Sequence, residues 1–141
     1  MPAEPLDLRI DVSGALPAVI TGGDALEIAV WVFLPDTLAQ RPAVISLLNG
    51  GTYDRRYFHF EVPGRSDYSL AEYLRARGHV VILPDHLGVG ASGRAKDQKL
   101  ATRHVCAAAN HAALEAIYQR LRAGTLAADF PAIPSFFKVG G

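Results

Sequence analysis

Two short apolar runs, each ending in a polar loop that contains glycine, constrain the fold of this chain more than any other feature. Residues 43–48 read AVISLL and stop at the tripeptide NGG, and residues 79–84 read HVVILP and stop at DHLGVGASG, residues 85–93. Apolar runs of this length bounded by turn residues are typical of buried strands. The segment SLAEYLRARG between them has helical spacing. A strand, a helix and a strand in this order predict two parallel strands joined by a crossover helix.

The remaining elements follow from residue spacing along the chain. We expect strands at residues 6–12 and 25–35, helices at 66–78 and 102–122, and a final strand at 136–141. A Gly-Gly-Asp turn joins the first two strands and favours antiparallel pairing, and Ser66 or Asp67 is expected to cap the first helix. This order predicts an α/β fold in which an N-terminal hairpin leads into a mainly parallel sheet flanked by helices. We expect residues 1–141 to form one domain.

Composition and charge exclude several classes of partner. Fourteen basic residues balance fourteen acidic ones, so no net field favours nucleic acid or an anionic membrane, and a small-molecule substrate fits better. No apolar run is long enough to span a bilayer, and the opening MPAEPLDLRI lacks the basic start and apolar core of a signal peptide, which predicts a cytoplasmic protein. His104 and His111 have helical spacing without a third ligand, so no metal is expected.

The loop at residues 85–93 contains a literal G-x-G-x-x-G at Gly88, Gly90 and Gly93. A dinucleotide fingerprint needs its last glycine to open a helix, whose N-terminus holds the pyrophosphate. The following RAKDQK is a poor helix start, and no acidic residue stands where the ribose contact requires one. A nucleotide-binding Rossmann-type protein is therefore only a third alternative, and no cofactor is expected.

A different pattern, D-x-x-G-x-G-x-S, is met by Asp85, Gly88, Gly90 and Ser92. Together with LLNGGTYD after the preceding apolar run, it resembles two loops of the α/β-hydrolase family, and the resemblance covers most of the chain. Asn49 departs from the family pattern, which more often has His at this position. The resemblance implies an incomplete α/β-hydrolase fold.

The resemblance also implies roles for the residues of both loops. The backbone N–H groups of Gly51 and Thr52 would stabilise the oxyanion of an acyl-transfer reaction. Because these N–H groups must approach a carbonyl, we expect the loop to exclude a Cβ at Gly50 and Gly51. Substrate contacts are expected from Gly50, Tyr53 and Tyr57, and loop-shaping roles from Asp85, Gly88 and Gly90.

The catalytic triad of such a hydrolase is not found in this sequence. The nucleophile of the family stands in G-x-S-x-G after the fifth strand, and none of the serines has that setting; Ser92 is assigned no nucleophilic role. We therefore expect the N-terminal half of a serine hydrolase that cleaves an ester, amide or related acyl bond when complete and is inactive alone. Its expected partner is the C-terminal remainder of the domain or another edge strand. The main alternative is a non-catalytic binding or interaction module that keeps the half-sheet.

Overall fold

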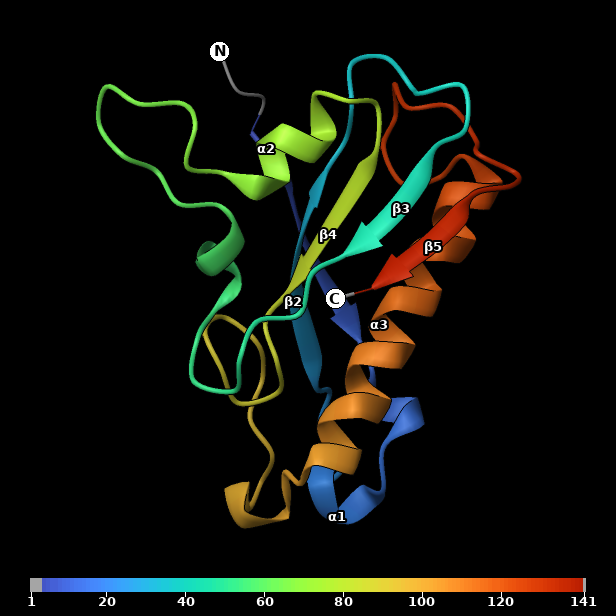
Figure 1. Ribbon diagram of the computed structural model, residues 1–141. Helices are drawn as coiled ribbons and strands as arrows, with labels where there is room; N and C mark the ends of the chain where they lie inside the picture. The colour runs from blue at the N-terminus through green and yellow to red at the C-terminus, as the bar shows by residue number, and fades with distance from the viewer. Residues whose placement is uncertain (1–3, 141) are drawn as a thin grey trace.

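The computed structural model describes residues 4–140 and contains a five-stranded sheet with helices on both faces (Figure 1). The strands are β1 (Leu6–Asp11), β2 (Glu27–Phe33), β3 (Ala43–Ser46), β4 (Val80–Pro84) and β5 (Phe137–Gly140). The helices are α1 (Ala18–Thr21), α2 (Leu70–Arg75) and α3 (Arg103–Ala123), and the short 3₁₀ turns are η1 (Ser13–Ala15), η2 (Arg55–Phe58) and η3 (Gln98–Leu100). The expected α/β class is confirmed.

The strands lie in the order β1-β2-β4-β3-β5. β2 pairs antiparallel with both β1 and β4, whereas β3 pairs parallel with β4 and with β5. Four strands therefore run in one direction and β2 in the other, which confirms an N-terminal hairpin leading into a mainly parallel sheet. The carboxyl ends of β3, β4 and β5 meet at one edge, and this brings the NGG loop next to the loop at residues 85–93.

The larger core lies between the sheet and α3 (Figure 1). Alternate residues of the central strands face this helix, including Val30 of β2 and Ile82 of β4. The apolar face of α3 supplies Ala109, Ala113, Ile117 and Leu121, all fully buried. The helix starts at the Thr102 cap and ends at Gly124, whose φ of 71° is left-handed, so its predicted limits are confirmed.

The opposite face of the sheet packs against α2. Phe33, Val81 and Leu83 form a second buried cluster there with Ala71 of the helix. The predicted cap of this helix is wrong: Ser69 is the cap, and its hydroxyl accepts a hydrogen bond from the Glu72 N–H at 3.0 Å. Asp67 is instead paired with the guanidinium of Arg65. None of the helices within residues 4–140 is both long and apolar enough to cross a bilayer.

Candidate functional site

The loops that follow β3 and β4 are joined by one buried carboxylate, that of Asp85 at the end of β4. Its side chain is almost fully buried, with 1% of the residue exposed. One oxygen, Oδ1, accepts a hydrogen bond from the Arg55 N–H at 2.7 Å, and the other, Oδ2, accepts one from the Ala91 N–H at 2.9 Å. Asp85 therefore holds the segment after NGG and its own loop in a fixed relation.

Two glycines allow the loop after β4 to close around this carboxylate. Gly88 and Gly90 have φ values of +81° and +54°, in the left-handed region. A Cβ on Gly90 would lie 2.4 Å from Asp85 Oδ2. The close approach of the Gly90 backbone to Asp85 therefore requires glycine.

Ser92 serves the same loop as a hydrogen-bonding residue. Its hydroxyl donates to the Asp85 carbonyl oxygen at 2.7 Å and accepts from the Ala29 N–H at 2.9 Å, and the side chain is buried. Both interactions tie the loop to the sheet and leave the hydroxyl without a catalytic base. The loop also opens no helix at Gly93, because α3 begins only at Arg103. The helix N-terminus that a dinucleotide needs is therefore not supplied at Gly93.

The NGG loop forms a tight turn held by the buried Asn49. The Asn49 amide donates to the carbonyl oxygens of Tyr53 and Gly50, and the Tyr53 N–H donates to the Gly50 carbonyl at 3.0 Å. Gly51 and Thr52 lie exposed at the tip. Within residues 4–140, neither of their N–H groups donates a hydrogen bond to the protein. The turn thus presents two unoccupied donors.

Crowding within the folded chain does not account for glycine at position 51. Neither Gly50 nor Gly51 has a positive φ. A Cβ on Gly51 would meet no atom within 4 Å, and one on Gly50 would approach Tyr53 Cδ2 at 3.3 Å. The folded backbone does not itself require glycine at position 51, so any exclusion of a Cβ there must come from a bound group.

A histidine that the sequence did not single out connects this turn to α3. His86 Nδ1 lies 2.8 Å from the Asn110 amide nitrogen, which can only donate, so Nδ1 accepts. Nε2 then carries the proton and donates to the Asn49 carbonyl oxygen at 2.6 Å. Asn110 is 6% exposed in an otherwise apolar helix face. A polar residue at an apolar position of this helix was the sequence feature that could have indicated the contact with His86. The Oδ1 atoms of Asn49 and Asn110 are buried without a hydrogen-bond partner among the described residues.

The next segment, η2, is anchored by Arg55. Its buried guanidinium contacts both carboxylate oxygens of Asp7, at 3.0 and 3.3 Å, and lies 4.2 Å from the centroid of the Trp31 ring. The hydrogen bond from Arg55 holds the pKa of Asp7 below its ordinary value. Arg55 Nε also lies 3.5 Å from Asp85 Oδ2. One buried cation therefore links β1, β2 and the end of β4.

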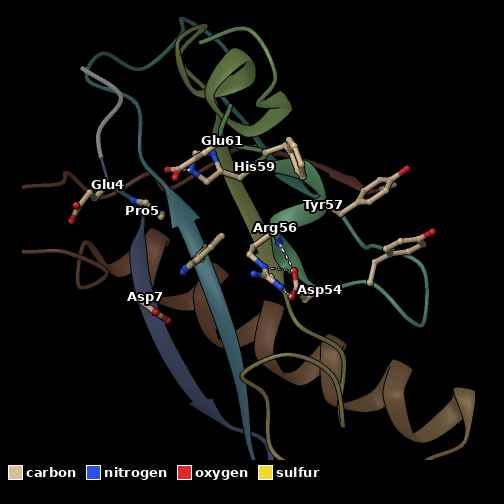
Figure 2. Close-up of a pocket in the computed structure, with 11 residues that line it drawn as sticks. Glu4, Pro5, Asp7, Asp54, Arg56, Tyr57, His59 and Glu61 are labelled. Carbon is tan, nitrogen blue, oxygen red and sulfur yellow. Dashed lines mark hydrogen bonds and ion pairs between the residues drawn. The ribbon is translucent and has the colours of Figure 1, made fainter. Parts of the chain in front are cut away.

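The predicted aromatic contacts lie beside the turn. Tyr53 and Tyr57 have ring centroids 5.2 Å apart and line a cavity of about 980 Å³ on the α2 side of the sheet. Figure 2 shows Tyr57 beside the Arg56–Asp54 ion pair, with His59, Glu61 and Glu4 around the same cavity. Gly50, Gly51 and Thr52 do not line it. The cavity therefore connects both tyrosines with β2, while Tyr53 also contacts Gly50 of the NGG turn.

A serine, a histidine and a carboxylate also lie in line at the start of α2. Ser69 Oγ is 2.8 Å from His59 Nδ1, and His59 Nε2 is 3.4 Å from Glu61 Oε1. Ser69 Oγ already accepts the Glu72 N–H as the helix cap. The serine does not stand in a glycine-flanked elbow, the setting that exposes a nucleophile in α/β-hydrolases. We assign this set to capping.

Among residues 4–140, the cysteine and the possible metal ligands form no catalytic or metal centre. Burial raises the pKa of the Cys106 thiol, which disfavours the thiolate. Across the described part of the chain, no group of three or more His, Cys, Asp or Glu side chains is arranged to hold a metal ion.

The sheet order, the two covered faces and the paired loops define the amino-terminal part of an α/β-hydrolase fold. The chain superposes on α/β hydrolase GrgF from Penicillium sp. with a TM-score of 0.53 and 17% identity over 83% of its length. It superposes on proline iminopeptidase from Mycobacterium smegmatis with a TM-score of 0.54 and 20% identity over 79%, and on a probable hydrolytic enzyme from Pseudomonas aeruginosa with 0.53 and 18% over 80%.

The chain spans about a third of these proteins, covering 33%, 32% and 30% of their respective lengths. At these identities the likeness establishes the fold alone. No protein-family model matches the sequence, and no curated protein matches it either.

Proposed function

We propose that this chain is the N-terminal half of a serine hydrolase that cleaves an ester, amide or related acyl bond, with the N–H groups of Gly51 and Thr52 as oxyanion donors. The observation that carries the proposal is the pair of unoccupied N–H groups at the tip of the NGG turn. The turn is braced by the Asn49 amide and by His86. Preorganised donors of this kind stabilise developing charge because they need no rearrangement during the reaction.

In this proposal the triad is supplied by a C-terminal remainder. Its serine would add to the acyl carbon, the negative charge on the carbonyl oxygen would lie at Gly51 and Thr52, and the leaving group would depart with a proton from the base. Water would then release the acyl group. The exposed edge of β5 supports this arrangement, because Phe137 is 62% and Val139 48% exposed there. A strand and helix from the remainder would cover them.

A fluorophosphonate probe and the downstream coding sequence test the proposal. The 141-residue chain is expected to remain unlabelled, and a polypeptide extended through an in-frame G-x-S-x-G is expected to be labelled at that serine. In the active extended protein, Gly51→Pro removes one donor and is expected to lower turnover about 10²- to 10³-fold. Gly51→Ala is the matched control, because it keeps the N–H and its Cβ meets no neighbouring atom. Labelling of Ser92 or Ser69 in the short chain would contradict the assignment.

The second candidate is a non-catalytic binding or interaction module. It would keep the sheet and the two braced loops, and it needs no G-x-S-x-G. A stop codon directly after Gly141, with no labelling of the folded chain, would support this candidate over the hydrolase.

A further inference from the structure

The cavity beside Trp31 has a composition that the proposed hydrolase chemistry does not use. It measures about 980 Å³ and lies between the start of β1, β2 and the loop at residues 53–61 (Figure 2). We propose that it binds a compact organic cation, an ammonium group carrying a small apolar body. The inference goes beyond hydrolysis, since binding at this cavity needs no triad.

Aromatic side chains form the apolar part of the cavity. Trp31, Tyr53, Tyr57 and Phe60 line it, and the last three are more than half exposed. The faces of such rings attract cations, most strongly the indole face. Trp31 already contacts one cation, Arg55, which does not line the cavity. Trp31 therefore lines the cavity while Arg55 does not, and the charge of Arg55 is balanced by Asp7 and Asp85.

Charge decides which ligand suits these rings. Four carboxylates line the cavity, those of Glu4, Asp7, Asp54 and Glu61, against the single guanidinium of Arg56. Asp54 pairs with Arg56 at 2.7 Å and Asp7 with Arg55 at 3.0 Å. Within residues 4–140, Glu4 and Glu61 have no guanidinium or ammonium partner. Two negative charges therefore remain in excess, which disfavours an anion and attracts a cation.

Glu61 has the position that a charge-selecting residue needs. Its carboxylate is 86% exposed and lies 3.4 Å from His59 Nε2. A second cavity of about 400 Å³ shares His59, Phe60 and Glu61 with the first, so Glu61 stands at their junction. Its exposure also means that replacing the carboxylate leaves the core intact.

Choline and 3,3-dimethyl-1-butanol make a matched pair of probes for the 141-residue chain. They share the same shape, and only choline carries a positive charge. Trp31 is the only tryptophan of the chain, so its fluorescence reports directly on this cavity. We expect choline to change the fluorescence saturably, with calorimetry as the second measurement. We expect binding of the neutral isostere to be at least about fivefold weaker, since the cation–π and carboxylate attractions are lost.

Variants separate this site from general electrostatic attraction. Glu61→Gln is expected to weaken choline binding about threefold or more, and Glu4→Gln to act in the same direction. Asp24→Asn is the matched control: its carboxylate is 79% exposed, outside the cavity, and binding should be unchanged. Equal binding of choline and its neutral isostere, no effect of Glu61→Gln, or no saturable binding of choline would each overturn the proposal.

Discussion

Within the loop after β4, the Gly90 backbone packs directly against the carboxylate of Asp85. Gly90 combines a φ of +54° with a position where a Cβ would lie 2.4 Å from Asp85 Oδ2. Gly90→Ala is therefore expected to lower the free energy of unfolding by about 2–3 kcal/mol, since backbone strain and displacement of a buried carboxylate add.

Urea denaturation measures this loss, and two other glycines serve as controls with smaller expected losses. Gly88→Ala has only the strain of its φ of +81°, with no atom near the new Cβ, and is expected to cost about 1 kcal/mol. Gly51→Ala has neither penalty and is expected to stay within about 0.5 kcal/mol of the parent chain. Equal losses at all three positions would contradict the steric argument.

The Asp7–Arg55 pair makes the free energy of unfolding depend on pH in the acid range. Asp7→Asn leaves the buried Arg55 with a weaker partner, and we expect a loss of about 1 kcal/mol at pH 7, reduced because the Asp7 side chain is 54% exposed. The pKa of Asp7 is lowered in the folded chain from 3.8, chiefly by its hydrogen bond with Arg55. Its stabilising contribution is therefore complete above that ordinary value and disappears as the pH falls through the lower folded pKa.

Urea titrations of both proteins from pH 7 to pH 2 check this sign. The unfolding free energies of the parent chain and Asp7→Asn should converge at the acid end. A difference that persists unchanged at pH 2 would show that the carboxylate acts through shape rather than charge. Asp24→Asn, at a pair 3.9 Å apart on the surface, is the control.

At this scale, sequence reasoning identified residue types more readily than their partners. Asp85, Gly88 and Gly90 stood out because a carboxylate followed by glycines is a turn pattern. His86 and Asn110 did not stand out, because their contact joins residues 24 apart in the chain. The hydrogen-bond partners of a buried amide are set by tertiary packing, which the neighbouring sequence does not reveal. The same holds for Arg55 of η2, whose buried position depends on Asp7 of β1 and Trp31 of β2.

Helix α2 shows how a local cap is chosen by tertiary structure. Three residues near its start, Ser66, Asp67 and Ser69, have side chains suited to capping. Ser69 is selected because its hydroxyl also meets His59 Nδ1 at 2.8 Å, across an isolated bridge between the two residues. Sequence spacing alone cannot supply that second contact. The limits of α3 were predictable because both of its caps are local.

Replacing the candidate caps one at a time distinguishes them. Ser69→Ala is expected to lower the free energy of unfolding by about 1–2 kcal/mol, since the helix loses its cap and His59 loses a partner. Ser66→Ala should have an effect within about 0.5 kcal/mol. Urea midpoints measure both variants. A larger loss for Ser66→Ala than for Ser69→Ala would show that Ser66, as sequence spacing favoured, caps the helix.

Over the whole molecule, the strand order separates what sequence could predict from what it could not. The apolar runs and the turn between the first two strands predicted the hairpin and the mainly parallel sheet. The insertion of β4 between β2 and β3 was not predictable, because strand neighbours are set by packing on both faces rather than by local sequence. Among residues 4–140, this order leaves β5 paired on one side only, with β3.

The exposed edge predicts self-association of the 141-residue chain. Lys138 faces α3, where its ammonium lies 3.3 Å from Glu115 Oε1. Phe137 and Val139 therefore face the other side of the sheet, where α2 packs mainly against β2 and β4. An apolar, half-paired edge strand recruits other chains. We expect dimers or larger species in sedimentation velocity at micromolar concentration.

Charges placed on this edge should separate the subunits. The double variant Phe137→Lys and Val139→Lys is expected to sediment as a monomer, because lysines on an edge strand oppose strand addition. Circular dichroism must show that it remains folded, as expected for side chains 62% and 48% exposed. Val19→Lys, 64% exposed on α1 and far from β5 in Figure 1, is the control and should leave the association unchanged. A monomeric parent chain that unfolds cooperatively, or equal dissociation by Val19→Lys, would show that β5 needs no partner.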